Sequence, residues 1–408
     1  MSEKFQAPRG THDVLPSEHR WWQLVRTMEE LAALYGYGRI QTPGFEDTAL
    51  FQRTSGDASD VVHKEMYTFK DRSDRSLTLR PEGTAPIARA YVEHGMHREP
   101  QPVKLFTIAP MYRYGTPGRG RYREHWQLSL EAFGSADPAI DAEVIHFYEQ
   151  LLGRLGVTKW ELRLNSIGDA ECRSAYVARL DEWLDAHADV LDEEARHKRA
   201  TSPLQVFDVK NPELRAALEA APKIGESLCD ACRAHFTEVR AHLERYGVPY
   251  VLDPTLVRGL DYYTRTTFEF IGPDENVNST ICGGGRYDGL VEEIGGPPTP
   301  GIGFGAGLER LILAIENEAP PPEPPSLDVF FVVDSGNRGD VPEQLMRLRA
   351  EGFAADMDYA GRSVKGQLRH AERHARQVVV VDGDTWTLRR RGEHDRQVDP
   401  ARLLEELG

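Results

Sequence analysis

A run of prolines near residue 320 divides this sequence of 408 residues into two unequal parts. Five of the eight residues from Ala319 to Ser326 are proline. Proline lacks a backbone N–H and fixes φ, so such a run neither joins a sheet nor continues a helix. The sequence therefore predicts a domain of residues 1–318, an extended linker of residues 319–326 and a second domain of residues 327–408.

The composition excludes several classes of protein. A formal net charge of −16 excludes a protein that coats nucleic acid with its whole surface, although a local basic patch remains compatible with it. The sequence contains no apolar stretch of about 18 residues, so we expect no membrane-spanning helix and no membrane partner. The N-terminus lacks an apolar signal segment, and four cysteines are too few for a disulfide scaffold. We therefore expect a cytoplasmic protein.

The second part has a short alternating pattern of strands and helices. Residues 329–333, 353–359 and 378–381 favour strands, and residues 341–350 and 363–375 have helical spacing. This order over about 80 residues predicts a small α/β domain with a parallel or mixed sheet.

The first part predicts an α+β domain. Residues 17–35 form a helix with one apolar face, and the segments near 100–135 and 255–315 are rich in strand signals. Between these segments, residues of about 170–246 are charged and helix-like. We expect an antiparallel sheet that is interrupted by a helical insertion.

One predicted strand carries the first chemical signal. In residues 123–133 the side chains alternate between two faces. The apolar face comprises Trp126, Leu128, Leu130 and Ala132. The polar face comprises His125, Gln127, Ser129 and Glu131. A polar face on such a sheet either lines a pocket or is open to solvent, and periodicity alone does not distinguish the two.

Three further segments combine charge, glycine and tyrosine. Arg113 precedes a loop, residues 114–121, whose glycines and arginines suit a phosphate. Residues 256–264 place Arg258 near Tyr262 and Tyr263, which suits a clamp for an oxyanion; the alternative is that at least one of the two tyrosines only packs. Residues 282–288 contain three consecutive glycines, which let backbone approach a ligand closely. Residues 301–306 match a dinucleotide fingerprint but follow prolines rather than a strand, and the sequence has no P-loop.

The cysteines favour packing over metal binding. Cys229 and Cys232 form one Cys-x-x-Cys pair, and His235 follows three residues later. These residues offer three ligands at most, and Cys172 and Cys282 lie far away in sequence. We therefore expect packed helical cysteines and no tightly bound metal.

These segments together resemble the histidyl-tRNA synthetase family of class II aminoacyl-tRNA synthetases. The resemblance also covers a dimer-forming strand that ends at Pro43, and it spans nearly all of residues 1–318. The other segments that carry it are residues 9–16 (RGTHDVLP), 64–69 (KEMYTF), 77–84 (LTLRPEGT), 111–113 (MYR) with the loop and strand to Glu131, 256–264 (LVRGLDYYT), 282–288 (CGGGRYD) and 301–310 (GIGFGAGLER).

The resemblance implies two reactions in one site. Histidine and ATP, the latter with Mg²⁺, give histidyl-adenylate, and the histidyl group then passes to the 3′ end of tRNA(His). The implied catalytic residues are Arg113 and Arg258. ATP is assigned to Arg113, Arg121 and Arg310. L-histidine is assigned to Glu82, Gly83, Thr84, Gln127, Glu131, Tyr262 and Tyr263, with Glu131 and Tyr263 at the imidazole ring.

The resemblance also implies partners. The second domain fits the family's anticodon-binding domain, and the family forms homodimers. Contacts with tRNA are expected from Arg119, Arg123 and Arg389. One alternative is a catalytically silent paralogue that senses histidine and regulates histidine biosynthesis. A second is an RNA-binding or scaffold protein, which would have no reason to keep Arg113, Glu131, Arg258 and Arg310 together.

Overall fold

The computed structural model describes residues 4–56, 59, 61–209, 211–273, 280–320, 326–334 and 338–407. The chain divides into two compact units, Met1–Pro321 and Pro322–Gly408. Most of the predicted linker, residues 321–325, lies outside the described residues. Within the described residues, no helix has both the length and the apolar character needed to cross a lipid bilayer.

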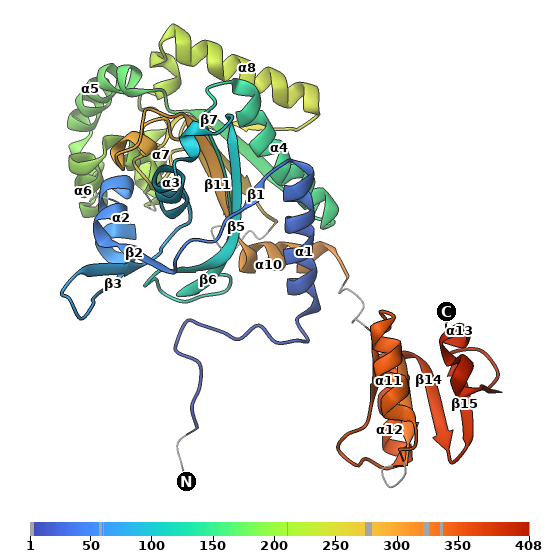
Figure 1. Cartoon of the computed structure of the whole chain (residues 1–408). Helices are drawn as coiled ribbons and strands as arrows, with labels where there is room; N and C mark the ends of the chain where they lie inside the picture. The colour runs from blue at the N-terminus through green and yellow to red at the C-terminus, as the bar shows by residue number, and fades with distance from the viewer. Residues whose placement is uncertain are drawn as a thin grey trace. The chain divides into compact units, whose positions relative to one another are not determined.

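The first unit is built on an eight-stranded sheet (Figure 1). Pairing is antiparallel from β5 to β7 and parallel only where β1 and β8 join the two edges. From edge to edge the strands are β1 (Gly38–Arg39), β5 (Val103–Tyr112), β6 (Glu124–Phe133), β11 (Gly301–Gly307), β10 (Thr280–Arg286), β9 (Thr264–Ile271), β7 (Glu161–Ser166) and β8 (Val251–Leu252).

Apolar helices cover one face of this sheet. α1 (His19–Leu34) buries Leu24, Met28 and Leu31 at helical spacing, as the sequence predicts. These side chains pack with α4 (Pro138–Arg154), α10 (Leu308–Glu318) and the apolar face of β6 in one core. The alternation predicted for β6 is confirmed on this side, since Leu128 and Leu130 are fully buried there.

The opposite face of β6 meets shorter elements. α3 (Thr84–Glu93) packs beside α9 (Leu290–Glu293), and its buried side chains belong to a second core that also contains Tyr262 and Tyr287. The chain before α3 forms a small antiparallel sheet of β2 (Phe45–Asp47), β4 (Ser76–Leu79) and β3 (Tyr67–Lys70), together with α2 (Thr48–Ser55) and the π-helical turn Val61–Glu65.

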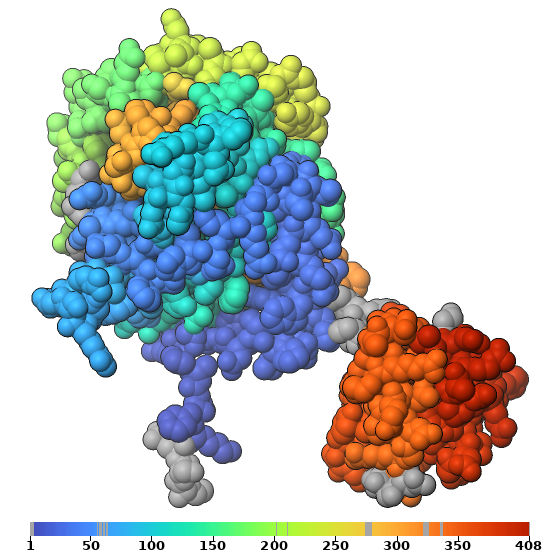
Figure 2. All heavy atoms as spheres, in the orientation of Figure 1, coloured from blue at the N-terminus to red at the C-terminus, as the bar shows by residue number. Residues whose placement is uncertain are grey.

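The predicted helical insertion is confirmed. It follows β7 and returns to the sheet at β8. Its helices gather on one side of the first unit, green to yellow in Figure 2. They are α5 (Ala170–Ala186), α6 (Glu193–Thr201), α7 (Pro212–Leu218) and α8 (Asp230–Tyr246), with 3₁₀ turns at Ala188–Val190, Pro203–Asp208 and Ile224–Ser227. A further 3₁₀ turn, Met96–Arg98, follows α3 outside the insertion.

The second unit has a mixed five-stranded sheet. Its strand order is β13 (Ala355–Met357), β12 (Leu327–Val333), β14 (Ala375–Asp382), β15 (Thr385–Arg390) and β16 (Arg396–Gln397), parallel across the first three and antiparallel beyond. Its helices are α11 (Val341–Ala350), α12 (Val364–His374) and α13 (Leu403–Leu407), the last preceded by a 3₁₀ turn, Pro400–Arg402.

The predicted small α/β fold is confirmed, and the structure adds β15 and β16. The sequence analysis missed this hairpin because arginines dominate its composition. Only Trp386 and Leu388 mark its buried face.

A buried ion pair joins the sheet to α4. Arg286 of β10 and Asp141 of α4 have no exposed side-chain surface, and the guanidinium donates to both carboxylate oxygens. Arg286 also donates to the Ser135 carbonyl at 2.9 Å and to Asp288 at 3.1 Å. The pair is therefore part of the interior that holds the glycine-rich strand in place.

Asp141→Asn is expected to destabilise the first unit by about 3–5 kcal/mol, because it removes the fully buried counter-charge of Arg286 and leaves only the partly exposed Asp288 beside the guanidinium. Asp74→Asn is the matched control, since its ion pair with Lys70 is exposed and contributes at most about 1 kcal/mol. Urea denaturation of the full chain measures both changes. Equal losses in the two variants would show that the buried pair does not stabilise the fold.

Candidate active site

A cavity of about 900 Å³ opens on the polar face of the sheet. Its floor is formed along one line of residues that pair with one another across four neighbouring strands. Ser129 of β6 pairs with Gly305 of β11, Gly305 with Gly283 of β10, and Gly283 with Glu269 of β9. Side chains stand at the ends of this row and glycines lie in its middle. The polar face of β6, which the sequence left open to two interpretations, therefore lines and underlies a cavity.

The central strands are rich in glycine because neighbouring side chains lie over them. A Cβ atom at Gly283 would lie 2.3 Å from Nη2 of Arg258. A Cβ atom at Gly303 would lie 1.8 Å from Oε2 of Glu131. The sequence analysis expected the glycines of residues 282–288 to let a ligand approach, and the structure shows that Gly283 makes room for a guanidinium of the protein itself, as Gly303 does for a carboxylate.

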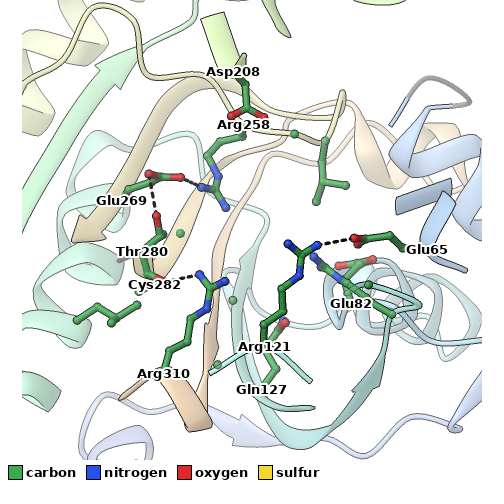
Figure 3. A pocket seen from close by; sticks show the side chains of 18 of the residues that line it. Glu65, Glu82, Arg121, Gln127, Asp208, Arg258, Glu269, Thr280, Cys282 and Arg310 are labelled. Carbon is green, nitrogen blue, oxygen red and sulfur yellow. Dashed lines mark hydrogen bonds and ion pairs between the residues drawn. The ribbon is translucent and has the colours of Figure 1, made fainter. Parts of the chain in front are cut away.

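Six arginines line this cavity, and four of them, Arg113, Arg121, Arg258 and Arg310, are the ones predicted from the sequence. Figure 3 shows Arg121, Arg258 and Arg310 pointing into it from different walls, and Arg113 lines it too. Burial lowers the pKa of Arg310, and the charges of Arg121, Arg113 and Arg258 lower it further. Arg310 is thus close enough to the other three guanidinium groups to be repelled by them, and such a site favours a polyanion.

Carboxylates and carbonyls hold these arginines in place. Arg258 donates to Glu269 of β9, which also accepts from Thr280 at 3.3 Å. Arg121 donates to Glu65 at 2.7 Å. Two of the arginines also reach backbone. Nε of Arg113 donates to the Pro81 carbonyl at 2.8 Å, and Nη1 of Arg310 donates to the Thr280 carbonyl at 2.9 Å.

The segment before α3 supplies a second polar group. Glu82 accepts the N–H groups of Thr84 and Ala85 at 2.6 and 2.8 Å, as an acidic residue at a helix start does. Burial raises the pKa of Glu82. Arg80 is buried and donates to the Thr42 and Pro110 carbonyls at 2.9 Å, which fixes this segment against the sheet.

Glu131 lies beneath the cavity rather than in its wall. Its carboxylate accepts from Thr84 Oγ1 at 2.7 Å and from the hydroxyl of Tyr287. Burial raises its pKa to about 8, although both hydrogen bonds act in the opposite direction. Thr84, which does line the cavity, connects it to Glu131.

Most of the residues predicted for histidine and ATP meet here. Tyr262 and Tyr263 lie where the chain turns before β9, and both line the cavity while they also pack in the second core. Gly83 immediately precedes α3. The predicted residues in the cavity wall are Glu82, Thr84, Arg113, Arg121, Gln127, Arg258, Tyr262, Tyr263 and Arg310.

Comparisons with known proteins identify the family to which this chain belongs. The family model described as "Histidyl-tRNA synthetase" matches residues 10–311. A histidine–tRNA ligase of Caldanaerobacter subterraneus subsp. tengcongensis is 46% identical over 383 residues, which is 93% of this chain and 92% of that protein. The chain belongs to the histidyl-tRNA synthetase family.

Solved structures agree with this assignment. The apo histidyl-tRNA synthetase of S. aureus matches with a TM-score of 0.84 and 35% identity, covering 99% of this chain and all of the other. A chain from Bacillus halodurans, titled an ATP phosphoribosyltransferase regulatory subunit/histidyl-tRNA synthetase, has a TM-score of 0.67 and 24% identity. It covers 94% of this chain and all of its own length, and it shows the fold alone.

Several members of this synthetase site were missed by sequence reasoning. Glu269 pairs with Arg258, and Tyr287 donates to Glu131. His125 also lines the cavity, and burial together with Arg113 and Arg310 lowers its pKa to about 3, which keeps the ring neutral. Tyr287 stands within the quoted segment 282–288, but its partner lies 156 positions away in sequence and only the sheet pairing brings them together.

The residues predicted for tRNA are spread over both units. Arg119 is exposed in the loop between β5 and β6, and Arg123 is half-buried at its end, over the ring of Tyr114. Arg389 lies in β15 of the second unit and pairs with Asp395 at 2.9 Å.

The buried carboxyl group of Glu131 should make the free energy of unfolding depend on pH. Below pH 4.5 this carboxyl group is protonated in both the folded and the unfolded chain. Between pH 4.5 and about 8 the unfolded chain releases the proton and the folded chain keeps it, so the free energy of unfolding falls as pH rises through this window. Glu131→Gln lacks this titration.

We therefore expect the wild type to lose stability relative to Glu131→Gln from pH 5 to 8. Urea denaturation of both proteins at matched pH values measures this difference, and titrations common to both cancel. A difference that stays constant with pH, or that changes in the opposite direction, would contradict the buried position of Glu131.

Proposed function

We propose that this chain, a histidine–tRNA ligase, carries out both of its reactions in the cavity described above. The observation that carries the proposal is the convergence of four guanidinium groups beside a buried carboxyl group. A polyanion fits the first feature, and a small polar molecule with ring nitrogens fits the second. Both substrates of the first reaction therefore have a complementary region in one cavity.

In the first step a carboxylate oxygen of histidine attacks the α-phosphorus of ATP. A new P–O bond forms, the bond to the bridging oxygen breaks, and pyrophosphate leaves. Negative charge moves among the oxygens around that phosphorus, so fixed cations are the groups that lower the barrier. We assign this role to Arg113 and Arg258, whose positions are held by Pro81 and Glu269.

The remaining arginines suit the other phosphates. Arg121, in the flexible glycine-containing loop, is assigned to the outer phosphates, and Arg310, held at the Thr280 carbonyl, to the nucleotide. ATP enters with Mg²⁺, which is bound in such sites mainly through substrate phosphates. This agrees with carboxylates that already have partners: Glu65 holds Arg121, Glu269 holds Arg258 and Glu82 caps α3.

Histidine recognition requires groups that an apolar analogue would leave unpaired. We assign the imidazole to Glu131, reached past Thr84, and to the hydroxyl of Tyr263. Tyr262 packs against Tyr263 with ring centroids 4.6 Å apart, which restricts the shape of this region. Glu82, Gly83, Thr84 and Gln127 are assigned to the α-amino end of the substrate.

In the second step the 3′-terminal ribose hydroxyl of tRNA(His) attacks the activated carbonyl carbon, and AMP leaves. Arg119 and Arg123 lie in the loop at the edge of the cavity and are assigned to the acceptor end. Arg389 of the second unit is assigned to the anticodon region, where phosphate contacts would supply affinity without reading bases. We further propose a homodimer and a cytoplasmic location, both on the strength of family membership.

The rival function is regulation by a silent paralogue. Its support is a likeness of fold to the Bacillus halodurans chain, at 24% identity. A silent paralogue does not need a complete cation set around the α-phosphorus. Histidine-dependent exchange of pyrophosphate into ATP by the purified chain separates the two functions, because only the ligase catalyses it.

Arg258→Ala is expected to fold and to lose adenylate formation by about 10²-fold or more, as removal of one charge-stabilising group typically does. The measurement is histidine-dependent ATP–pyrophosphate exchange at saturating substrates. Arg179→Ala is the matched control, because Arg179 lies on α5 in an exposed pair with Glu226, and its exchange rate should equal that of the wild type. Exchange near the wild-type rate in Arg258→Ala would reject the assigned role.

A further inference from the structure

Three cysteines and an aspartate meet where the helical insertion begins and ends. Asp169 and Cys172 stand at the start of α5, and Cys229 and Cys232 at the start of α8. One ligand atom from each lies within 4.8 Å of all the others. We call these four residues the thiolate cluster.

We propose that the thiolate cluster binds one structural Zn²⁺ ion. The donor set is sulfur-rich and includes one carboxylate oxygen, and Zn²⁺ accepts both ligand types in a tetrahedral site. Tetrahedral zinc–sulfur bonds of about 2.3 Å place neighbouring sulfurs about 3.8 Å apart, so the cluster needs only a small contraction to close around the ion. Four protein ligands make the site closed, which is typical of structural rather than catalytic zinc.

The hydrogen bonds around the sulfurs are those that thiolates need. The N–H of Cys229 donates to Sγ of Cys172 at 3.0 Å, and the N–H of Cys232 donates to Sγ of Cys229 at 3.5 Å. Such N–H donors, at the starts of two helices of 17 residues each, are in place to stabilise the sulfurs once a metal has displaced their protons.

The carboxylate also fits a metal better than an apolar cluster. Oδ2 of Asp169 lies 3.0 Å from Sγ of Cys232 and 3.9 Å from Sγ of Cys229. Arg265, with Nη2 at 3.9 Å from the same oxygen, supplies positive charge outside the ligands. Without an ion this oxygen accepts the S–H groups of Cys232 and Cys229; on zinc binding the two thiols would lose these protons and the oxygen would turn to the ion.

The backbone is shaped to bring Cys172 into the cluster. Gly168 has φ +61°, and a Cβ atom there would lie 2.6 Å from Cβ of Cys172. Its carbonyl accepts the N–H of Arg265 at 2.7 Å, which ties the turn to the start of β9. The sequence analysis dismissed Cys172 because it lies 57 positions from Cys229, and it offered His235 instead. In the structure His235 faces Asp141 at 3.5 Å and is not a ligand.

The ion would link the two ends of the helical insertion, at the start of α5 and the start of α8. Asp169 and Cys232 are 63 positions apart, so one metal would join the two ends of a long segment whose helices otherwise pack on one another. Arg173, one residue beyond Cys172, donates to the carbonyl of Tyr263 in the cavity wall. The proposal stands apart from the assignment of substrates in the cavity.

The test is the metal content of the full chain purified without chelators, measured by inductively coupled plasma mass spectrometry. We expect about one zinc per chain, as a closed structural site gives. Cys172→Ser and Cys232→Ser should lose at least about nine tenths of it, because each removes one thiolate ligand. Cys282→Ser is the matched control and should keep its zinc, because this fourth cysteine lies in β10 at the cavity.

A second measurement needs no variant. Wild-type chain reconstituted with Co²⁺ should show the near-ultraviolet thiolate-to-cobalt charge-transfer band, with the intensity of three Co–S bonds. Wild type that holds no zinc as purified or after reconstitution under reducing conditions would overturn the proposal. So would zinc content that is equal in all three variants, or a cobalt spectrum with no thiolate band.

Discussion

Mutual repulsion among four arginines is the constraint on which this structure depends. Arg113 follows β5, Arg121 lies in the same loop, Arg258 precedes β9 and Arg310 lies in the first turn of α10. Bringing these charges into one half-buried cavity costs free energy in the absence of a polyanion, as the lowered pKa of Arg310 records. Part of that cost is offset by Glu65 and Glu269, and the phosphates of ATP would offset the rest.

The sheet makes this gathering possible. Antiparallel pairing places β6, β11, β10 and β9 side by side although they lie far apart in the chain. Gly283 and Gly303 leave room above the strands for Arg258 and for Glu131. The buried pair of Asp141 and Arg286 holds the same strand from beneath. Different residues of neighbouring strands thus supply the charged groups, the room for them and the buried ion pair that fixes the strand.

Much of the architecture could be predicted from the sequence, because the spacing of apolar residues along a short segment indicates whether it forms a helix or a strand. The apolar spacing of α1 and the alternation along β6 were both correct. Contacts between residues far apart in the sequence could not be predicted from such local patterns. The contacts of Tyr287 with Glu131 and of Cys172 with Cys229 span 156 and 57 positions, so only the folded chain brings them together.

The thiolate cluster connects the helical insertion with the wall of the cavity. Its four residues lie at the ends of the segment, and Arg173 of the same helix reaches the carbonyl of Tyr263. A metal there would stabilise the base of the insertion next to the wall of the cavity. The central claim, however, concerns the two arginines assigned to the α-phosphorus.

A double-mutant cycle tests that claim most directly. Pyrophosphate exchange is measured for the wild type, for Arg113→Ala and Arg258→Ala, and for the variant that carries both. If the two guanidinium groups act on one phosphorus, their losses are strongly non-additive, and the double variant is only slightly slower than the slower single variant. Losses that multiply as independent effects would contradict the account, because the two arginines would then act at separate places.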